Sequence, residues 1–218
     1  MTKHRIVETD QGIQGEITVA VYDQMQRRLK DKGWIETGDI IKSGICQGTA
    51  LELGPGPGYL GLEWLKHTEG TVLKGLDISP AMTEMAKQNA KEYGLSERVE
   101  YILSSGAKMP FKDDFFDAVF TNGSLHEWAE PRKTFNEIWR VLKQDGRLFI
   151  SDLRRDMFQF VKWFLWLNSK PKEIRHGLTT SINAAYTPEE LKKLIRWTRL
   201  EQCKVTSNLI GLKIVGMK

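Results

Sequence analysis

Cysteine is scarce in this chain: its 218 residues include only Cys46 and Cys203. Two thiols cannot build a disulfide framework or a structural zinc site made of cysteines, and such low usage is typical of a reducing compartment. Long apolar runs are also missing, since no segment approaches the ~20 residues that cross a bilayer. The first residues lack the apolar stretch of a secretory signal. We therefore expect a cytoplasmic protein with no transmembrane segment and no metal ion.

Blocks of like charge are absent as well. The 32 Lys and Arg residues exceed the 28 Asp and Glu residues only slightly, and both signs are spread along the chain. This pattern favours a solvated, lysine-rich surface, and the alternative is an electrostatic footprint for nucleic acid. A hydrophobic content of 40% in a chain of this length is enough for one domain with a sizeable core.

Glycine and proline are concentrated at one place, the sequence GPGPG at residues 54–58. An apolar segment precedes this turn and a helix-like pattern follows it. A glycine turn between a strand and a helix lets the backbone approach a ligand closely. A nucleoside triphosphate loop is excluded, because Tyr59 and Leu60 stand where a lysine and a serine or threonine are needed.

The chemistry of this turn disfavours a pyrophosphate. Pro55 and Pro57 lack the N–H groups that would bind an anion, and Glu52 adds a negative charge. Asp77 ends a second apolar segment about 20 residues after Gly56, where a carboxylate can accept both hydroxyls of a ribose. Together these features favour S-adenosylmethionine, which has positive charge and no phosphate, over a dinucleotide. The alternative is a glycine-rich turn with an incidental surface aspartate.

Segments typical of strands alternate with segments typical of helices. The predicted strands are residues 49–53, 71–77, 98–103, 116–122 and 146–152, and the predicted helices are residues 59–68, 79–94 and 132–143. This alternation indicates βαβ units with right-handed crossovers. We therefore predict an α/β fold with a doubly wound, mostly parallel sheet and helices on both faces.

The two ends of the chain depart from this rhythm. Residues 16–32 read as an amphipathic helix, residues 187–198 as a helix that begins with a capping box, and residues 201–218 as two closing strands of an antiparallel hairpin. Residues 156–170 are apolar and aromatic all round a helix, a pattern that usually means burial. We expect this segment to pack in the core or to cover an apolar pocket. A homodimer interface and contact with a membrane surface are the alternatives.

Four motifs resemble, in their order, those of class I S-adenosylmethionine-dependent methyltransferases. They are ELGPGPG, GLDIS, MPFKDDFFDAVFTNGSLHEW and EIWRVLKQDGRLFISD. The similarity is greatest to the small-molecule branch with the menaquinone and ubiquinone methyltransferases. It implies a Rossmann-like sheet of seven strands whose last strand is antiparallel. The single domain would comprise an N-terminal helical lid (1–47), a cofactor-binding core (48–152), an aromatic-rich helical lid (153–187), and a C-terminal helix with the closing hairpin (188–218).

The resemblance also implies which residues contact the cofactor. The glycine turn and the end of the fourth strand would face its methionine part, Asp77 would hold its ribose, and two apolar residues would line its adenine. Tyr22, on the first helix, would reach the cofactor carboxylate, or else lie on the buried face of that helix. The full set is Tyr22, Glu52, Gly54, Pro55, Gly56, Gly58, Asp77, Ile78, Met82, Ser105, Gly106, Ala107, Asn122 and Gly123.

One position departs from the family pattern. Ser105 stands where the family commonly has an aspartate that accepts a hydrogen bond from the adenine amino group. We expect the serine hydroxyl, or the backbone around Gly106 and Ala107, to make this contact instead.

The methyl group of the cofactor is already activated, so transfer mainly requires that the acceptor is held in line with it. A base is needed only where the acceptor must lose a proton. His126 is the candidate for that step because its ordinary pKa is near neutral, and the alternative is a structural histidine. Asp152 ends the fifth predicted strand, and we expect it to cap the segment that follows it, with substrate binding as the alternative.

The expected function is methyl transfer from S-adenosylmethionine to a small apolar or aromatic molecule, with S-adenosylhomocysteine as the second product. We expect this acceptor to be enclosed between the first helix and the aromatic segment 156–170. The alternatives are an RNA or protein methyltransferase and a non-catalytic cofactor-binding protein. The sequence NGSL at residues 122–125 argues against enzymes that methylate amino groups of bases, which typically have an Asn/Asp-Pro-Pro-aromatic run there.

Overall fold

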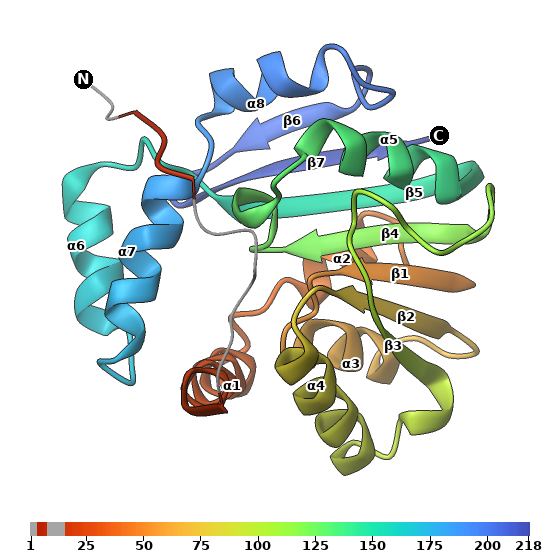
Figure 1. The fold of residues 1–218 in the computed structure, drawn as a ribbon, viewed down its shortest axis with the longest axis horizontal. Helices are drawn as coiled ribbons and strands as arrows, with labels where there is room; N and C mark the ends of the chain where they lie inside the picture. Colours follow the sequence, from red (N-terminus) through yellow and green to blue (C-terminus); the bar gives the residue numbers. More distant parts are fainter. Residues whose placement is uncertain (1–3, 8–15) are drawn as a thin grey trace.

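The computed structural model describes residues 4–7 and 16–218. Its centre is a seven-stranded sheet with the order β3-β2-β1-β4-β5-β7-β6 (Figure 1). The strands are β1 (Thr49–Leu53), β2 (Val72–Asp77), β3 (Val99–Leu103), β4 (Phe116–Asn122), β5 (Leu142–Leu153), β6 (Lys204–Ser207) and β7 (Gly211–Met217). Strands β1 to β5 are parallel, and β7 is antiparallel to both β5 and β6. The predicted sheet of seven strands, mostly parallel with an antiparallel last strand, is confirmed.

Helices lie on both faces of this sheet (Figure 1). They are α1 (Glu16–Asp31), α2 (Thr37–Lys42), α3 (Tyr59–Lys66), α4 (Pro80–Glu92), α5 (Pro131–Val141), α6 (Gln159–Asn168), α7 (Ile174–Ala184) and α8 (Pro188–Ile195), with short 3₁₀ turns η1 (Ser96–Arg98) and η2 (Leu125–Glu127). One core cluster joins the sheet to α2 and α3, and another joins it to α5 and α8. The doubly wound arrangement follows from this distribution.

The strands supply both cores by alternation of their side chains. In β1, Ala50 faces the α2–α3 core while Leu51 faces the α5–α8 core, and Ala118 and Val119 divide in the same way in β4. All four side chains are buried. Near-continuous apolar runs of this kind are expected of central parallel strands that are covered on both faces.

Local capping explains where two of the helices begin. The Ser79 hydroxyl accepts a hydrogen bond from the Met82 backbone N–H at 3.2 Å and caps α4 immediately beyond the end of β2. Thr187 and Glu190 form the predicted capping box at the start of α8. Side-chain oxygens at these positions satisfy N–H groups that the first turn of a helix leaves without partners.

The expectation that the aromatic segment 156–170 is buried is wrong for its outer side. Helix α6 packs mainly on α7 and lies outermost in this pair, beyond the ends of the strands (Figure 1). Met157 and Val161 are buried in that contact, and Leu165 is half-buried against it. Because α6 packs mainly on this one neighbour among the described elements, its other side is left exposed.

The close packing of α3 on the sheet gives a test of the fold. A side chain at Gly61 would overlap Glu52 Oε2 and Leu73 Cδ2, whereas one at Gly177 in α7 meets no atom within 4 Å. We expect Gly61→Ala to lower the free energy of unfolding by about 1–3 kcal/mol, because overpacking displaces strand side chains. Gly177→Ala, the matched control, should raise it by about 0.5–1 kcal/mol. Urea denaturation measures both, and equal effects of the two substitutions would contradict this packing.

Candidate active site

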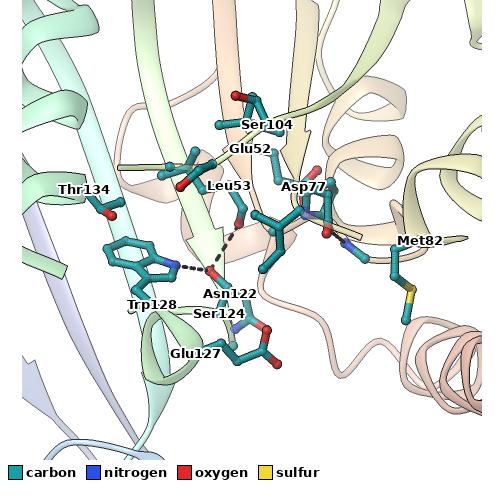
Figure 2. Close-up of a pocket in the computed structure, with 18 of the residues that line it drawn as sticks. Glu52, Leu53, Asp77, Met82, Ser104, Asn122, Ser124, Glu127, Trp128 and Thr134 are labelled. Atoms are coloured by element: carbon teal, nitrogen blue, oxygen red, sulfur yellow. Dashed lines mark hydrogen bonds between the residues drawn. The ribbon is translucent and has the colours of Figure 1, made fainter. Parts of the chain in front are cut away.

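A cavity opens at the carboxyl ends of β1, β2 and β4 (Figure 2). This edge is where open α/β sheets bind their ligands. The cavity is lined by Tyr22, Gln26, Glu52, Leu53, Gly54, Pro55, Gly56, Pro57, Tyr59, Leu60, Leu76, Asp77, Ile78, Met82, Ser104, Ser105, Gly106, Ala107, Asn122, Gly123, Ser124, Glu127, Trp128, Ala129, Glu130 and Thr134.

Thirteen of the fourteen residues that the sequence analysis assigned to the cofactor line this one cavity, and the exception is Gly58. They come from α1, the β1–α3 turn, the end of β2 with the start of α4, the loop after β3, and the end of β4. The fold therefore gathers the predicted set in one place. Whether each of them touches the cofactor stays a prediction.

The glycine turn has a backbone that only glycine adopts without strain. Gly54, Gly56 and Gly58 have φ angles of 62°, 54° and 87°, in the left-handed region. Space is also restricted, because a Cβ at Gly54 would lie 2.6 Å from Ser124 Cβ and one at Gly58 would lie 2.5 Å from the Tyr101 hydroxyl. The turn thus presents backbone, rather than side chains, to the cavity.

Asp77 connects the end of β2 to the glycine turn. Its Oδ2 accepts a hydrogen bond from the Gly56 N–H at 3.1 Å, and its Oδ1 accepts one from the Ser79 N–H at 2.9 Å. Burial raises the pKa of this carboxyl, while the backbone N–H groups of Ser79, Gly56 and Ile78 act in the opposite direction. Each oxygen of a carboxylate can accept a further hydrogen bond, so Asp77 can hold the turn and also receive ribose hydroxyls.

Glu52 is a buried acid without a cationic partner. Only 2% of the residue is exposed, and its Oε2 has no hydrogen-bond partner among the described residues. Burial, together with the negative charge of Asp77, raises the pKa of Glu52 to about 8. A buried carboxyl in this setting is stabilised in its charged form when a positive ligand binds nearby.

The lining of the cavity is one-sided in charge. Four carboxyl groups, Glu52, Asp77, Glu127 and Glu130, line it, and no Lys, Arg or His is among the described lining residues. Phosphate sites depend on cations or on clustered backbone N–H donors. This cavity suits a ligand that is positively charged and carries no phosphate.

The end of β4 is held to β1 by a small hydroxyl network (Figure 2). The Thr121 hydroxyl lies 2.6 Å from both the Leu53 carbonyl and the Ser124 hydroxyl. Trp128 donates its indole N–H to the Ser124 hydroxyl at 3.1 Å, which places its ring against the cavity. The Asn122 amide donates to Ser151 at 2.9 Å and to Glu36 at 3.0 Å. The backbone of Asn122 and Gly123 is therefore fixed at the cavity edge.

The loop after β3 forms the wall predicted to meet adenine. The Ser105 hydroxyl accepts a hydrogen bond from the Ala107 N–H at 3.2 Å and so closes a local turn. That role leaves its own hydroxyl hydrogen available for another acceptor. The backbone between Ser104 and Ala107 lines the cavity beside Thr134.

Tyr22 lies on α1 above the glycine turn. A Cβ at Gly56 would be 3.4 Å from Tyr22 Cε1, and the Tyr22 hydroxyl accepts a hydrogen bond from the Gln26 amide at 2.9 Å. Burial raises the pKa of Tyr22, so the phenol stays protonated and can donate a hydrogen bond. Its position in the lining agrees with the predicted contact to a cofactor carboxylate.

His126 lies in a buried pair with Asp152 rather than in the cavity lining. Its Nδ1 is 2.8 Å from Asp152 Oδ1, and its backbone N–H donates to Asp152 Oδ2 at 2.7 Å. Asp152 also accepts from the Leu153 N–H at 2.7 Å, but its buried partner is the histidine. The expected capping role of Asp152 is thus secondary to its contact with His126, whose Nε2 lies 3.9 Å from Glu127 Oε1.

Sequence reasoning missed several residues of the cavity. Glu127 ends the 3₁₀ turn η2, Trp128 and Glu130 follow it, and Thr134 lies in the first turn of α5. The motif NGSLHEW contains the first two, but their orientation depends on the Ser124 hydroxyl network. Gln26 could have been found, because it lies one helical turn after Tyr22 on the same face of α1.

Two searches of the described residues are negative. No group of three or more metal-binding side chains lies close enough to hold an ion. Within residues 4–7 and 16–218, no helix has the length and apolar character of a membrane span.

Comparisons with known proteins agree with this geometry. Residues 51–150 match the family profile described as "Methyltransferase domain". The chain is 27% identical over 200 residues to the ubiquinone/menaquinone biosynthesis C-methyltransferase UbiE of Geotalea daltonii, covering 88% of this chain and 83% of that protein. It is 32% identical over 119 residues to the uncharacterized methyltransferase YcgJ of Bacillus subtilis. That alignment covers 54% of this chain and 46% of YcgJ, less than half of the relative.

Solved structures show the same fold. A putative S-adenosyl-L-methionine-dependent methyltransferase from Methanococcus maripaludis superposes with a TM-score of 0.71 at 21% identity, covering 99% of this chain and 95% of that one. A SAM-dependent methyltransferase from Aquifex aeolicus superposes with a TM-score of 0.64 at 22% identity, covering 84% and 89%. At these identities the likeness establishes the Rossmann-like methyltransferase fold.

The raised pKa of Glu52 predicts a dependence of stability on pH. An acid with a pKa of about 8 in the folded chain and 4.5 in the unfolded chain holds its proton in the folded state between these values. Its contribution to stability is therefore complete below pH 4.5 and is lost as the pH rises to 8. Glu52→Gln keeps the shape of the neutral acid and does not titrate. We expect the free energy of unfolding of the variant to rise, relative to that of the unchanged protein, between pH 4.5 and pH 8. If the free energies of the two proteins changed in parallel with pH, Glu52 would not have the raised pKa of a buried acid.

Proposed function

We propose that this chain, whose residues 51–150 match a methyltransferase domain, transfers a methyl group from S-adenosylmethionine to a small, largely apolar or aromatic acceptor. The observation that carries the proposal is the cavity itself, in which four carboxyl groups and no described cation surround a glycine turn. A sulfonium and an ammonium group complement such a lining, and a pyrophosphate does not.

The residues present fit this cofactor part by part. Asp77 would receive the ribose hydroxyls, the glycine turn and the end of β4 would face the methionine portion, and Tyr22 would donate to its carboxylate. Ile78 and Met82 would flank the adenine, beside the loop that contains Ser105. The cofactor supplies an activated methyl group, and the protein has to hold the acceptor in line with it and to exclude water.

One of the relatives favours a small acceptor. That protein is named as acting in ubiquinone and menaquinone biosynthesis. Enclosure by Trp163, Phe164 and Trp166 is not part of this proposal, because these residues are exposed and do not line the cavity. RNA or protein remains the alternative acceptor class.

The acceptor class is tested by transfer of labelled methyl groups into a fractionated cell extract. The proposal predicts label in the small-molecule fraction, extractable into organic solvent. Label confined to RNA or to protein would refute the small acceptor while leaving the methyltransferase activity. Absence of label in every fraction, in a protein that binds the cofactor, would favour a non-catalytic binding protein.

We propose His126 as the proton acceptor where the reaction needs one. Contact of its Nδ1 with Asp152 favours the tautomer in which Nδ1 carries the hydrogen, so that Nε2 is the nitrogen able to take a proton. His126 also adjoins Glu127, which lines the cavity. In the alternative role, the pair with Asp152 only positions the loop that carries Glu127 and Trp128.

Replacement of Asp77 tests the ribose contact. Asp77→Asn removes one charged acceptor, so the affinity for S-adenosylmethionine should fall by about tenfold or more. Asp113→Asn is the matched control, since Asp113 is exposed and lies outside the cavity. Titration calorimetry measures both variants, and an unchanged affinity in Asp77→Asn would move the ribose site elsewhere.

Two substitutions of His126 separate a base from a positioning residue. His126→Ala removes both ring nitrogens, whereas the amide of His126→Asn can still donate to Asp152 but cannot take up a proton. If His126 acts as a base, we expect kcat to be about 100-fold lower in both variants. The affinity for the cofactor should then be nearly unchanged. Recovery of kcat in the Asn variant would show a positioning role. His67→Ala, at an exposed histidine, should have no effect.

A further inference from the structure

Helix α6 carries an apolar stripe that no described residue covers. Phe160, Trp163, Phe164 and Leu167 follow the i, i+3, i+4, i+7 spacing of one helix face, and their exposed fractions are 67%, 62%, 58% and 45%. The opposite face, with Val161, packs on α7. Helix α6 is thus apolar on two sides but buried on one. Contiguous exposed apolar surface of this kind marks an interaction site.

Positive charge adjoins this stripe. Lys170 and Lys172 lie in the segment that joins α6 to α7, and Arg175 lies in the first turn of α7. Glu173 is the only carboxyl group between residues 159 and 180. Both lysines are exposed, and neither forms an ion pair with a described residue. The Arg175 guanidinium lies 4.2 Å above the centre of the Trp166 ring, at the C-terminal end of α6.

We propose that the α6 stripe and the adjoining cations dock this protein on a membrane surface that contains anionic lipid. Tryptophan is enriched where bilayer meets water, and an apolar helix face with flanking Lys and Arg binds in the plane of that interface. The charge of residues 170–175 decides between occupants. Anionic headgroups complement this excess of positive charge, whereas a second copy of the chain would present the same excess.

Docking at this place connects to the cavity wall through α7. Helix α7, which carries α6, also packs on η2, and η2 supplies Glu127 to the cavity lining. Docking would then hold the enzyme at the surface of the phase in which an apolar acceptor dissolves. This last consequence rests on the proposed function, but membrane binding itself does not.

Vesicle sedimentation with the full chain tests the proposal. We expect binding to vesicles of equal parts phosphatidylcholine and phosphatidylglycerol, weaker binding to phosphatidylcholine alone, and release by added salt. The double substitution Trp163→Ser, Phe164→Ser should lower the partition coefficient on the mixed vesicles by about tenfold or more. Trp197→Ser, the control at a tryptophan that is 75% exposed elsewhere, should leave it unchanged.

A second pair of variants tests the charge. Lys170→Glu with Lys172→Glu should also lower the partition coefficient by about tenfold or more. Lys87→Glu with Lys91→Glu, at exposed positions on α4, changes the net charge equally and should have a small effect. These variants keep α6 intact, so they test docking even if the aromatic double variant were to unfold.

Three results would overturn the proposal. The first is vesicle binding that does not depend on phosphatidylglycerol. The second is an equal loss of vesicle binding in the two pairs of lysine variants. The third is that the unchanged protein forms a dimer, which the aromatic double variant dissociates without any change in vesicle binding. The last result would assign the stripe to a second copy. Cofactor titration and methyl transfer, measured on the same variants, separate the two proposals. Vesicle binding without methyl transfer refutes only the proposed function. Methyl transfer without vesicle binding refutes only the docking proposal.

Discussion

The site depends on carboxyl groups held at one edge of the sheet, and no Lys, Arg or His among the described residues lines the cavity beside them. Glu52 is buried at the end of β1 and Asp77 at the end of β2, and the charge of Asp77 contributes to the raised pKa of Glu52. Such an arrangement costs free energy in the folded chain. A positively charged ligand offsets that cost, and a phosphate increases it. The cavity therefore selects its ligand by charge before any specific contact is formed.

Backbone geometry and side-chain hydrogen bonds keep this edge open. The left-handed glycines remove side chains from the turn, and Asp77 fixes the middle of the turn through the Gly56 N–H. Across the sheet, Thr121 and Ser124 bind the Leu53 carbonyl and so fix the separation of β1 and β4. Each of these residues both stabilises the fold and shapes the ligand site. The two roles coincide because the carboxyl ends of the parallel strands meet where the helices begin.

The sequence was sufficient for the sheet, most of the helices that cover it and thirteen of the residues that line the cavity, because these depend on local signals. The GPGPG turn, the acid after β2 and the capping residues Ser79 and Thr187 each act within a few residues of their own position. The placement of His126 could not be predicted, because Asp152 comes from the next strand and the two meet only in the sheet. The exposure of α6 was mispredicted for a related reason: apolar composition indicates a need for a partner but does not say whether the same chain provides it.

One comparison of ligands tests the central claim, that charge selects the ligand of this cavity. The full chain is titrated calorimetrically with S-adenosylmethionine and with NAD at the same ionic strength. Both ligands contain adenosine, but the first carries positive charge and the second carries a pyrophosphate. The account predicts that S-adenosylmethionine binds and that NAD gives no measurable heat. Binding of NAD as tight as that of S-adenosylmethionine would contradict it.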